Sequence, residues 1–268
     1  MKNWFKKTAT VILTAAMALS FSLPTFAAET IDIDEELRSR GYPQILLENM
    51  TDSAKQSLYK KENAIFSGGS ITTYNQESGE YTSYEIPADG IATVGQIPEE
   101  DLTLSCITSK IGNTHIFVEF SYTWNDLPIF RWQDPISISW NDDLFEMQSG
   151  SFYKVDMYDA INDRTLEKIY GGVKSEQYSY ASASPSGVTW YADLKGYGID
   201  IIPTSLYGHA EFTLLKDHNA TGNSRLYGHY VHPTASTTLS VTIPNFGNFN
   251  VSGAGAYDDL GDDWGFLY

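Results

Sequence analysis

The chain contains a single cysteine, few basic residues and no apolar run long enough for a membrane span. Cys106 stands alone among 268 residues, so neither an intramolecular disulfide nor a cluster of thiolate ligands can form. Lys and Arg number 17 against 34 Asp and Glu, which gives a formal charge of −17. A field of this sign repels nucleic acid, so we expect no nucleic-acid partner.

Residues 1–27 have the pattern of a secretory signal peptide. Lysines near the start precede the largely apolar stretch Ala9–Leu23, and small residues lead up to Ala27. The stretch falls short of the roughly 20 apolar residues of a membrane span, so we expect cleavage after Ala27 and no span. Cleavage removes three lysines and no acid, which leaves 14 basic and 34 acidic residues and a charge of −20.

We therefore expect a secreted, extracellular protein that is released from the cell. There is no cysteine at the cleavage site for lipid attachment, and the last residues, Asp262–Tyr268, form no apolar anchor. Export without disulfides is typical of Gram-positive bacteria. The sequence leaves the oligomeric state and any association with the cell wall open.

Residues 28–62 are predicted to form a short helical segment. Acidic residues at Asp34–Glu36 suit the start of a helix, Gly41 suits its end, and Ser53 with Gln56 resembles a capping box. Apolar residues recur at steps of three and four, at Leu47, Met50, Ala54 and Leu58. We expect this stripe to dock on the main domain.

Residues 63–268 are predicted to form one all-β domain. In the clearest strand, His115–Trp124, apolar residues occupy one face, and Glu119 lies on the other, predicted to face solvent. Leu102–Cys106 alternates in the same way, and a turn at Lys110–Asn113 predicts a hairpin between the two.

Further alternating rows occur along the rest of the chain, with Gly, Pro, Asn and Asp clusters between them. Three examples are Ile136–Trp140, Ala210–Leu214 and Leu239–Ile243. Ten or more short strands without a long helix between them predict an antiparallel β-sandwich or a jelly-roll-like fold.

No catalytic motif stands out, so the catalytic residues are left unassigned. Zinc-protease, P-loop and nucleophile-elbow patterns are absent. His229 and His232 would point to opposite faces of one strand, which disfavours a shared metal ion. A glycoside hydrolase needs two carboxylates across a cleft, and Glu119 is the best placed acid, although a solvated face residue explains it equally.

Trp132 is the candidate ligand-binding residue. Exposed aromatic rings can serve as platforms for sugar rings, and a negative field does not oppose a neutral glycan. Trp124 and Trp140 share the apolar parity of their strands, which predicts that they pack in the core. Trp132 falls in a predicted loop, where an exposed ring could bind sugar.

Four carboxylates near the C-terminus are a candidate Ca²⁺ site. Asp258, Asp259, Asp262 and Asp263 lie within six residues, and Gly261 could bend the chain between them. Several carboxylate oxygens can hold Ca²⁺, although the order of an EF-hand loop is missing. A solvated acidic turn is the alternative. No other cofactor is expected.

The opening of the predicted mature chain resembles that of secreted proteins of unknown function from Gram-positive bacteria. The likeness rests on about 20 residues: Arg40-Gly41-Tyr42-Pro43-Gln44, then Leu47, Met50 and Leu58-Tyr59. This resemblance implies an exported protein and carries no activity with it.

The sequence favours a secreted, non-catalytic all-β protein that binds a component of the cell envelope or an external ligand, such as a neutral glycan. The alternative is a secreted hydrolase acting on glycans through a carboxylate pair that the sequence does not identify. A cleft with two converging acids would favour the enzyme.

Overall fold

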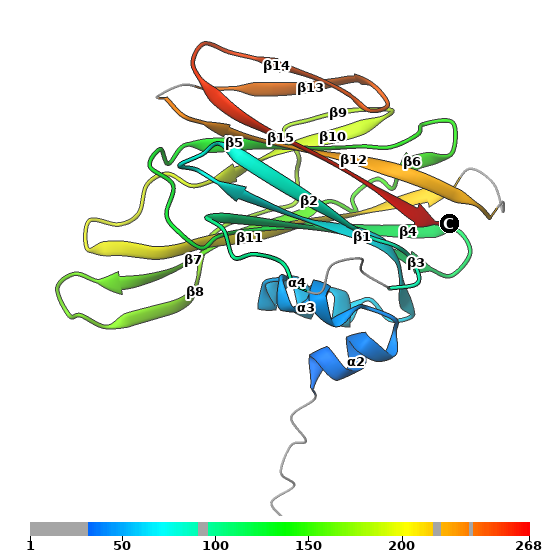
Figure 1. Ribbon diagram of the computed structural model, residues 1–268, viewed down its shortest axis with the longest axis horizontal. Helices are drawn as coiled ribbons and strands as arrows, with labels where there is room; N and C mark the ends of the chain where they lie inside the picture. Colours follow the sequence, from blue (N-terminus) through cyan, green and yellow to red (C-terminus); the bar gives the residue numbers. More distant parts are fainter. Residues whose placement is uncertain (1–31, 91–95, 217–220, 236–237) are drawn as a thin grey trace, which may run out of the picture. The chain divides into compact units, whose positions relative to one another are not determined.

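The computed structural model describes residues 32–90, 96–216, 221–235 and 238–268 (Figure 1). The predicted signal peptide lies outside these residues. All the described helices and strands lie in one compact unit, Ile33–Tyr268. None of the described helices is long and apolar enough to cross a membrane.

Three short described helices open this unit and lie within the predicted helical segment 28–62: α2 (Ile33–Ser39), α3 (Gln44–Glu48) and α4 (Asp52–Lys60). Gly41, with a φ of 88°, turns the chain after α2 in a conformation that suits glycine. The expected cap at Ser53 was wrong. Thr51 caps α4, because its hydroxyl accepts a hydrogen bond of 3.2 Å from Ala54 N.

Fifteen strands follow the helices in the described part of the chain. They are β1 (Ala64–Asn75), β2 (Glu80–Ile86), β3 (Leu102–Ile111), β4 (His115–Trp124), β5 (Gln133–Ser139), β6 (Phe145–Met147), β7 (Tyr153–Asn162), β8 (Lys168–Gln177), β9 (Ser182–Ser184), β10 (Gly187–Asp193), β11 (Ile201–Lys216), β12 (Asn223–Pro233), β13 (Ser240–Asn245), β14 (Asn248–Ser252) and β15 (Tyr257–Leu267).

The strands form an antiparallel β-sandwich, which confirms the predicted fold class. Sheet A has eight strands in the order β2-β1-β3-β4-β11-β7-β8, with β6 paired to β11. Sheet B has the order β15-β12-β5-β10-β9, and β13 and β14 form a separate hairpin. The predicted hairpin of β3 and β4 is present, with Leu102 opposite Trp124 and Ile111 opposite His115.

The main core fills the space between sheets A and B. The even-numbered residues of β4, from Ile116 to Trp124, face inward against apolar residues of β5, β10, β12 and β15. Trp124 and Trp140 are buried, which confirms their predicted place in the core. Cys106 is buried among them and is a free thiol.

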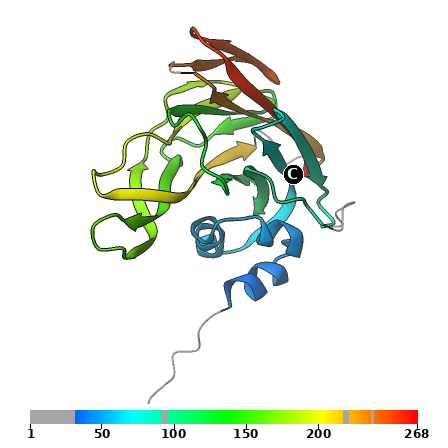
Figure 2. The same ribbon diagram turned by 60° about the vertical axis from the view of Figure 1, so that its left-hand side comes forward.

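The helices cover the opposite face of sheet A (Figure 2). Leu46, Leu47 and Leu58 pack on Ile107 and Phe117 of the sheet, which confirms that the helical stripe docks on the β domain. The second face of β4 is therefore not solvated, contrary to the prediction, because the helical layer lies over it. Its acidic residue Glu119 is 1 % exposed.

The β13–β14 hairpin packs against the outer side of sheet B. Val241 of β13 joins Val231 of β12 in a small buried cluster. Close contact requires glycine at one point, because a Cβ on Gly187 of β10 would lie 2.4 Å from Ile243 Cδ1. Each sheet of the sandwich is thus covered over part of its outer face, sheet A by helices and sheet B by this hairpin.

Candidate functional site

Trp132 lies in the loop before β5 and is half-buried rather than exposed. Its carbonyl oxygen accepts a hydrogen bond of 2.9 Å from Leu194 N, in the loop after β10. This contact could not be predicted from the sequence, because the pairing of β5 with β10 is what places Leu194 beside Trp132. Trp132 is therefore less exposed than the sequence suggested, and its role in ligand binding stays a prediction.

The four C-terminal carboxylates lie on a strand, not on the predicted turn. Successive residues of β15 point to opposite faces, so Asp258 and Asp262 face β1 while Asp259 and Asp263 face outward. Each has its own partner: Tyr74 for Asp258, His229 for Asp259, Ser70 for Asp262 and Arg225 for Asp263. The fold does not bring the four together.

The two histidines of β12 point to opposite faces, as the sequence predicted. His229 stacks on Phe249 of β14, with ring centroids 4.6 Å apart, whereas His232 Nδ1 lies 2.8 Å from buried Asp134. Among the described residues, no group of three or more His, Cys, Asp or Glu is placed to hold a metal ion.

Two clefts lie one after the other along the outer face of sheet A beside α4, and we call them together the groove. Outward side chains of β7 and β11 form much of the floor, and these strands are paired, for example at Ser205 with Asp159 and Glu211 with Tyr153. Thr103 of β3 and Thr123 of β4 also line the first cleft. The row on β11 is Ser205, Tyr207, His209, Glu211 and Thr213. Residues at the start of α4 and along its side form the wall.

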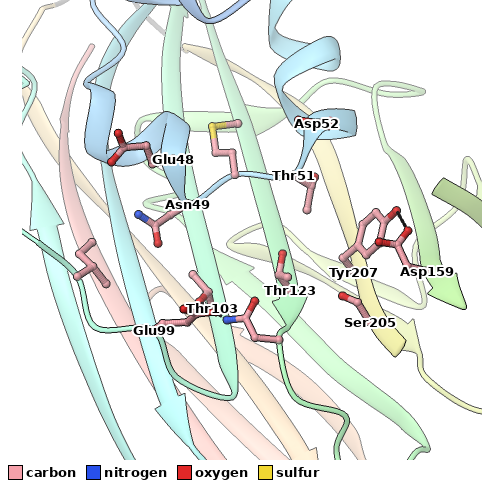
Figure 3. Close-up of a pocket in the computed structure, with 13 residues that line it drawn as sticks. Glu48, Asn49, Thr51, Asp52, Glu99, Thr103, Thr123, Asp159, Ser205 and Tyr207 are labelled. Atoms are coloured by element: carbon pink, nitrogen blue, oxygen red, sulfur yellow. Dashed lines mark hydrogen bonds between the residues drawn. The ribbon is translucent and has the colours of Figure 1, made fainter. Parts of the chain in front are cut away.

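The first cleft of this groove, with a volume of about 520 Å³, lies at the N-terminal end of α4 (Figure 3). Hydroxyl groups, amides and the carboxylates of Glu48, Asp52, Glu99 and Asp159 line it, and none of its described lining residues is basic. Tyr207 donates a hydrogen bond of 2.9 Å to Asp159 Oδ1. Burial and this bond raise the pKa of Tyr207 to about 12, so its hydroxyl stays a donor.

The second cleft, of about 690 Å³, continues along β7 and β11 and has an aromatic wall. The rings of Tyr153 and Tyr178 lie 5.3 Å apart, and Tyr178 is 73 % exposed. On the floor, Glu211 accepts hydrogen bonds from Ser57 and, at 2.8 Å, from Lys61. The cleft thus combines an open aromatic face with fixed polar groups.

His209, among the residues that line this second cleft, has a buried nitrogen atom without a hydrogen-bond partner in the described part of the chain. It is 5 % exposed, and its Nδ1 lies 3.1 Å from Ser53 Oγ. Burial lowers the pKa of His209 to about 4, so the ring is neutral at pH 7. Its Nε2 has no hydrogen-bond partner in the described part of the chain, although such buried groups are usually paired.

Glu119 lies directly opposite Glu211 on the neighbouring strand, beneath the helical layer. Neither of its carboxyl oxygens has a hydrogen-bond partner among the described residues. Burial, then the nearby carboxylate of Glu211, raises the pKa of Glu119, and Lys61 opposes this. The sequence identified Glu119 as the best placed acid but gave it the wrong environment.

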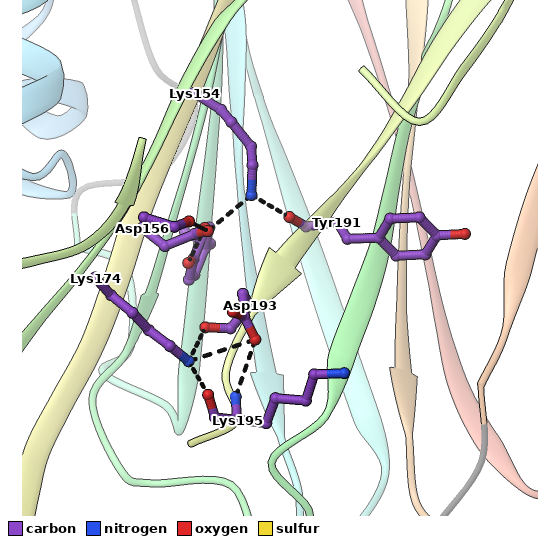
Figure 4. A network of polar contacts seen from close by, with 8 residues as sticks. Lys154, Asp156, Lys174, Tyr191, Asp193 and Lys195 are labelled. Carbon is purple, nitrogen blue, oxygen red and sulfur yellow. Dashed lines mark hydrogen bonds and ion pairs between the residues drawn. The ribbon is translucent and has the colours of Figure 1, made fainter. Parts of the chain in front are cut away.

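A second polar network joins the edge of sheet A to sheet B (Figure 4). Lys154 and Asp156 form a buried ion pair of 2.7 Å, and Lys154 also donates to the Tyr191 carbonyl. Tyr122 and Ser175 donate to the same Asp156. Because every group here has a partner, we assign the network a structural role.

Comparison with known proteins assigns no family. No protein-family model matches the chain, and no curated protein matches it. Among solved structures, it is similar to a "Pore forming protein" (9 % identity, 76 % of this chain, 91 % of the other, TM-score 0.34). It is also similar to the C-terminal domain of the Streptococcus pyogenes antigen I/II-family protein AspA, with 12 % identity over 71 % of this chain and 56 % of the other, and a TM-score of 0.33. For BspA_C_WT the identity is 9 % over 75 % of this chain and 59 % of the other, with a TM-score of 0.34.

Proposed function

We propose that this protein is exported and acts by binding, and that the groove beside α4 takes a neutral, hydroxyl-rich ligand such as a glycan chain. The proposal rests on the side chains that line the groove. The outward residues of β7 and β11 include carboxylates, hydroxyls, a neutral imidazole and tyrosine rings. Carboxylates accept hydrogen bonds from sugar hydroxyls, and an aromatic face packs against the apolar face of a sugar ring.

The charge of the protein restricts the ligand further. The first cleft offers carboxylates without a basic residue among its described lining groups, and the expected mature chain carries −20. Both features oppose a polyanion and leave a neutral chain unopposed. The second cleft has two lysines among its lining residues: Lys61 pairs with Glu211 and therefore offers less to an anion, whereas Lys60 is exposed.

The groove is long enough for an extended ligand. From Ser205 to Thr213, β11 advances about 26 Å at roughly 3.3 Å per residue. The side chains along this length alternate with inward ones, so polar groups recur at a regular spacing. A chain of several sugar units could contact both clefts, whereas a single small molecule would fill only one.

Isothermal titration of neutral oligosaccharides against the secreted protein tests the proposal. We expect Tyr178→Ala and Asp159→Asn each to weaken binding about tenfold, because each removes about 1 to 2 kcal/mol of stacking or hydrogen bonding. Tyr170→Ala is the matched control, since Tyr170 is 71 % exposed but lies outside the residues that line the groove. Equal losses in all three variants would contradict the site.

A glycan hydrolase is the second candidate, favoured by the position of Glu119 opposite Glu211. Their environments differ, one buried without a partner and one bound to Ser57 and Lys61, which is typical of acid and base pairs. Glu119 does not line either cleft, however, so a substrate in the groove would not reach it. Glycan cleavage that is lost in both Glu119→Gln and Glu211→Gln would establish the enzyme.

A further inference from the structure

Three loops at one end of the sandwich present strongly exposed aliphatic side chains. Ile129 is 78 % exposed in the loop after β4, Leu166 is 75 % exposed in the β7–β8 turn, and Ile199 is 99 % exposed in the loop after β10. Phe130, beside Ile129, is 39 % exposed. Exposed apolar residues are unremarkable singly but indicate an interaction site when they gather.

Backbone hydrogen bonds link these loops in pairs. Asp163 N donates a hydrogen bond of 2.9 Å to Asp200 O, which joins the β7–β8 turn to the loop after β10. Leu194 N donates to Trp132 O, which joins that loop to the loop after β4. Figures 1 and 2 both show the β7–β8 turn beside the loop between β10 and β11, at the left of each view.

The loops are held so that their tips stay exposed. Lys174 donates to the carbonyl oxygens of Asp193 and Lys195 at the base of the third loop (Figure 4). Its ammonium group also lies 4.5 Å from the ring centre of Tyr197. Leu166 has a φ of 58°, a conformation that costs energy for a leucine, yet its side chain gains no burial there.

We propose that these loop tips insert into the headgroup region of a zwitterionic phospholipid bilayer, independently of the groove. Each apolar tip has an exposed basic residue nearby in sequence: Arg131, Arg164 or Lys195. The same loops carry acids, including Asp200, which pairs with Arg164 at 2.8 Å. Both signs of charge around apolar tips match a headgroup that carries a phosphate and a positively charged ammonium group.

A lipid surface fits these tips better than a folded protein partner. A stable protein interface buries about 800 Å² on each side with close shape complementarity. The tips instead project from three separate loops and are mostly aliphatic rather than the aromatic residues typical of interface hot spots. A bilayer needs no complementary shape and accepts aliphatic side chains directly.

Co-sedimentation with lipid vesicles tests the inference, using the protein recovered from the medium of a secreting host. Vesicles of phosphatidylcholine should pellet the protein, and an equal mixture with phosphatidylglycerol should not improve binding. Ile129→Ser with Ile199→Ser should lower the partition coefficient at least about tenfold. Ile65→Ser is the matched control, since Ile65 is 57 % exposed at the start of β1, where that strand pairs with the far end of β3.

Each outcome bears on the proposal. A loss confined to the loop variant supports it, provided that the variant unfolds at the same urea concentration as the wild type. No binding of the wild type to either vesicle overturns it, as does equal binding by the loop variant. A loss equal to that of Ile65→Ser also overturns it, because the effect would then be one of general surface hydrophobicity.

Discussion

Replacing Glu119 by glutamine is expected to stabilise the protein above neutral pH. The carboxyl group of Glu119 is 1 % exposed, faces Glu211 across the strand pair and has no hydrogen-bond partner among the described residues. Its ionisation would place a second negative charge beneath α4, where only Lys61 opposes it. Glutamine keeps the shape of the side chain and removes that charge.

The sign of the pH dependence follows from the raised pKa. The folded state holds the Glu119 proton more tightly than the unfolded state does. The contribution of protonated Glu119 to the free energy of unfolding is therefore fully present below the unfolded pKa of about 4.3. It is lost as the pH rises through the folded pKa, with a slope of up to about 1.4 kcal/mol per pH unit. His209 acts in the opposite direction, since its lowered pKa reduces stability below about pH 6.5.

Urea unfolding of the wild type and of Glu119→Gln separates these two effects. The measurements run from about pH 4.5 to about pH 8.5, a range chosen to span the unfolded pKa of His and to start near that of Glu. The difference between the two proteins cancels His209, so it should grow with pH and favour the variant by about 1 to 3 kcal/mol at the alkaline end. Glu176→Gln, at an exposed cleft residue, is the control and should show no such trend. Parallel curves for wild type and Glu119→Gln would refute the reasoning.

Three further predictions can be checked separately. Cys106 should react with a thiol reagent only after denaturation, because it is buried and burial raises its pKa; rapid labelling of the folded protein would contradict this. N-terminal sequencing of the secreted protein should begin at Ala28, whereas retention of Met1 would contradict export. Ca²⁺ should raise the melting temperature no more than Mg²⁺ does, because the aspartates of β15 have separate partners; a Ca²⁺-specific shift lost in Asp259→Asn with Asp262→Asn would establish the Ca²⁺ site.

Local patterns in the sequence predicted the elements that depend on neighbouring residues. The β3–β4 hairpin follows from alternation on either side of a glycine turn, and the helical stripe follows from three- and four-residue spacing. The environment of Glu119 could not be predicted in this way. Alternation shows which residues share a face, but only the tertiary contact with the helices shows that the polar face of β4 is covered.

The acidic C-terminal segment could have been recognised as a strand from its sequence pattern. Leu260, Trp264 and Phe266 share one parity and are buried, which is the pattern of a strand. Asp262 interrupts the row at an inward position, where it accepts a hydrogen bond from Ser70 of β1. That partner lies 192 residues away, so the charge cluster looked like a turn.

The groove was only partly visible in the sequence. Ala210, Phe212 and Leu214 mark the inward parity of β11, which implies that His209, Glu211 and Thr213 face outward. The groove draws on α4, β7 and β11, and on further segments such as β3, β4 and β8, which lie far apart along the chain. Their proximity depends on the order of strands in sheet A, which no local pattern specifies.

Hydrogen exchange with and without ligand tests the central claim most directly. The ligand is the neutral oligosaccharide that binds most tightly in the calorimetric series, and exchange is followed by mass spectrometry on peptides across the chain. The groove predicts added protection in α4, in Tyr153–Asn162 and in Ile201–Lys216, with none in the β13–β14 hairpin. Protection in that hairpin alone, or no change in α4, would contradict the claim that the ligand lies in the groove.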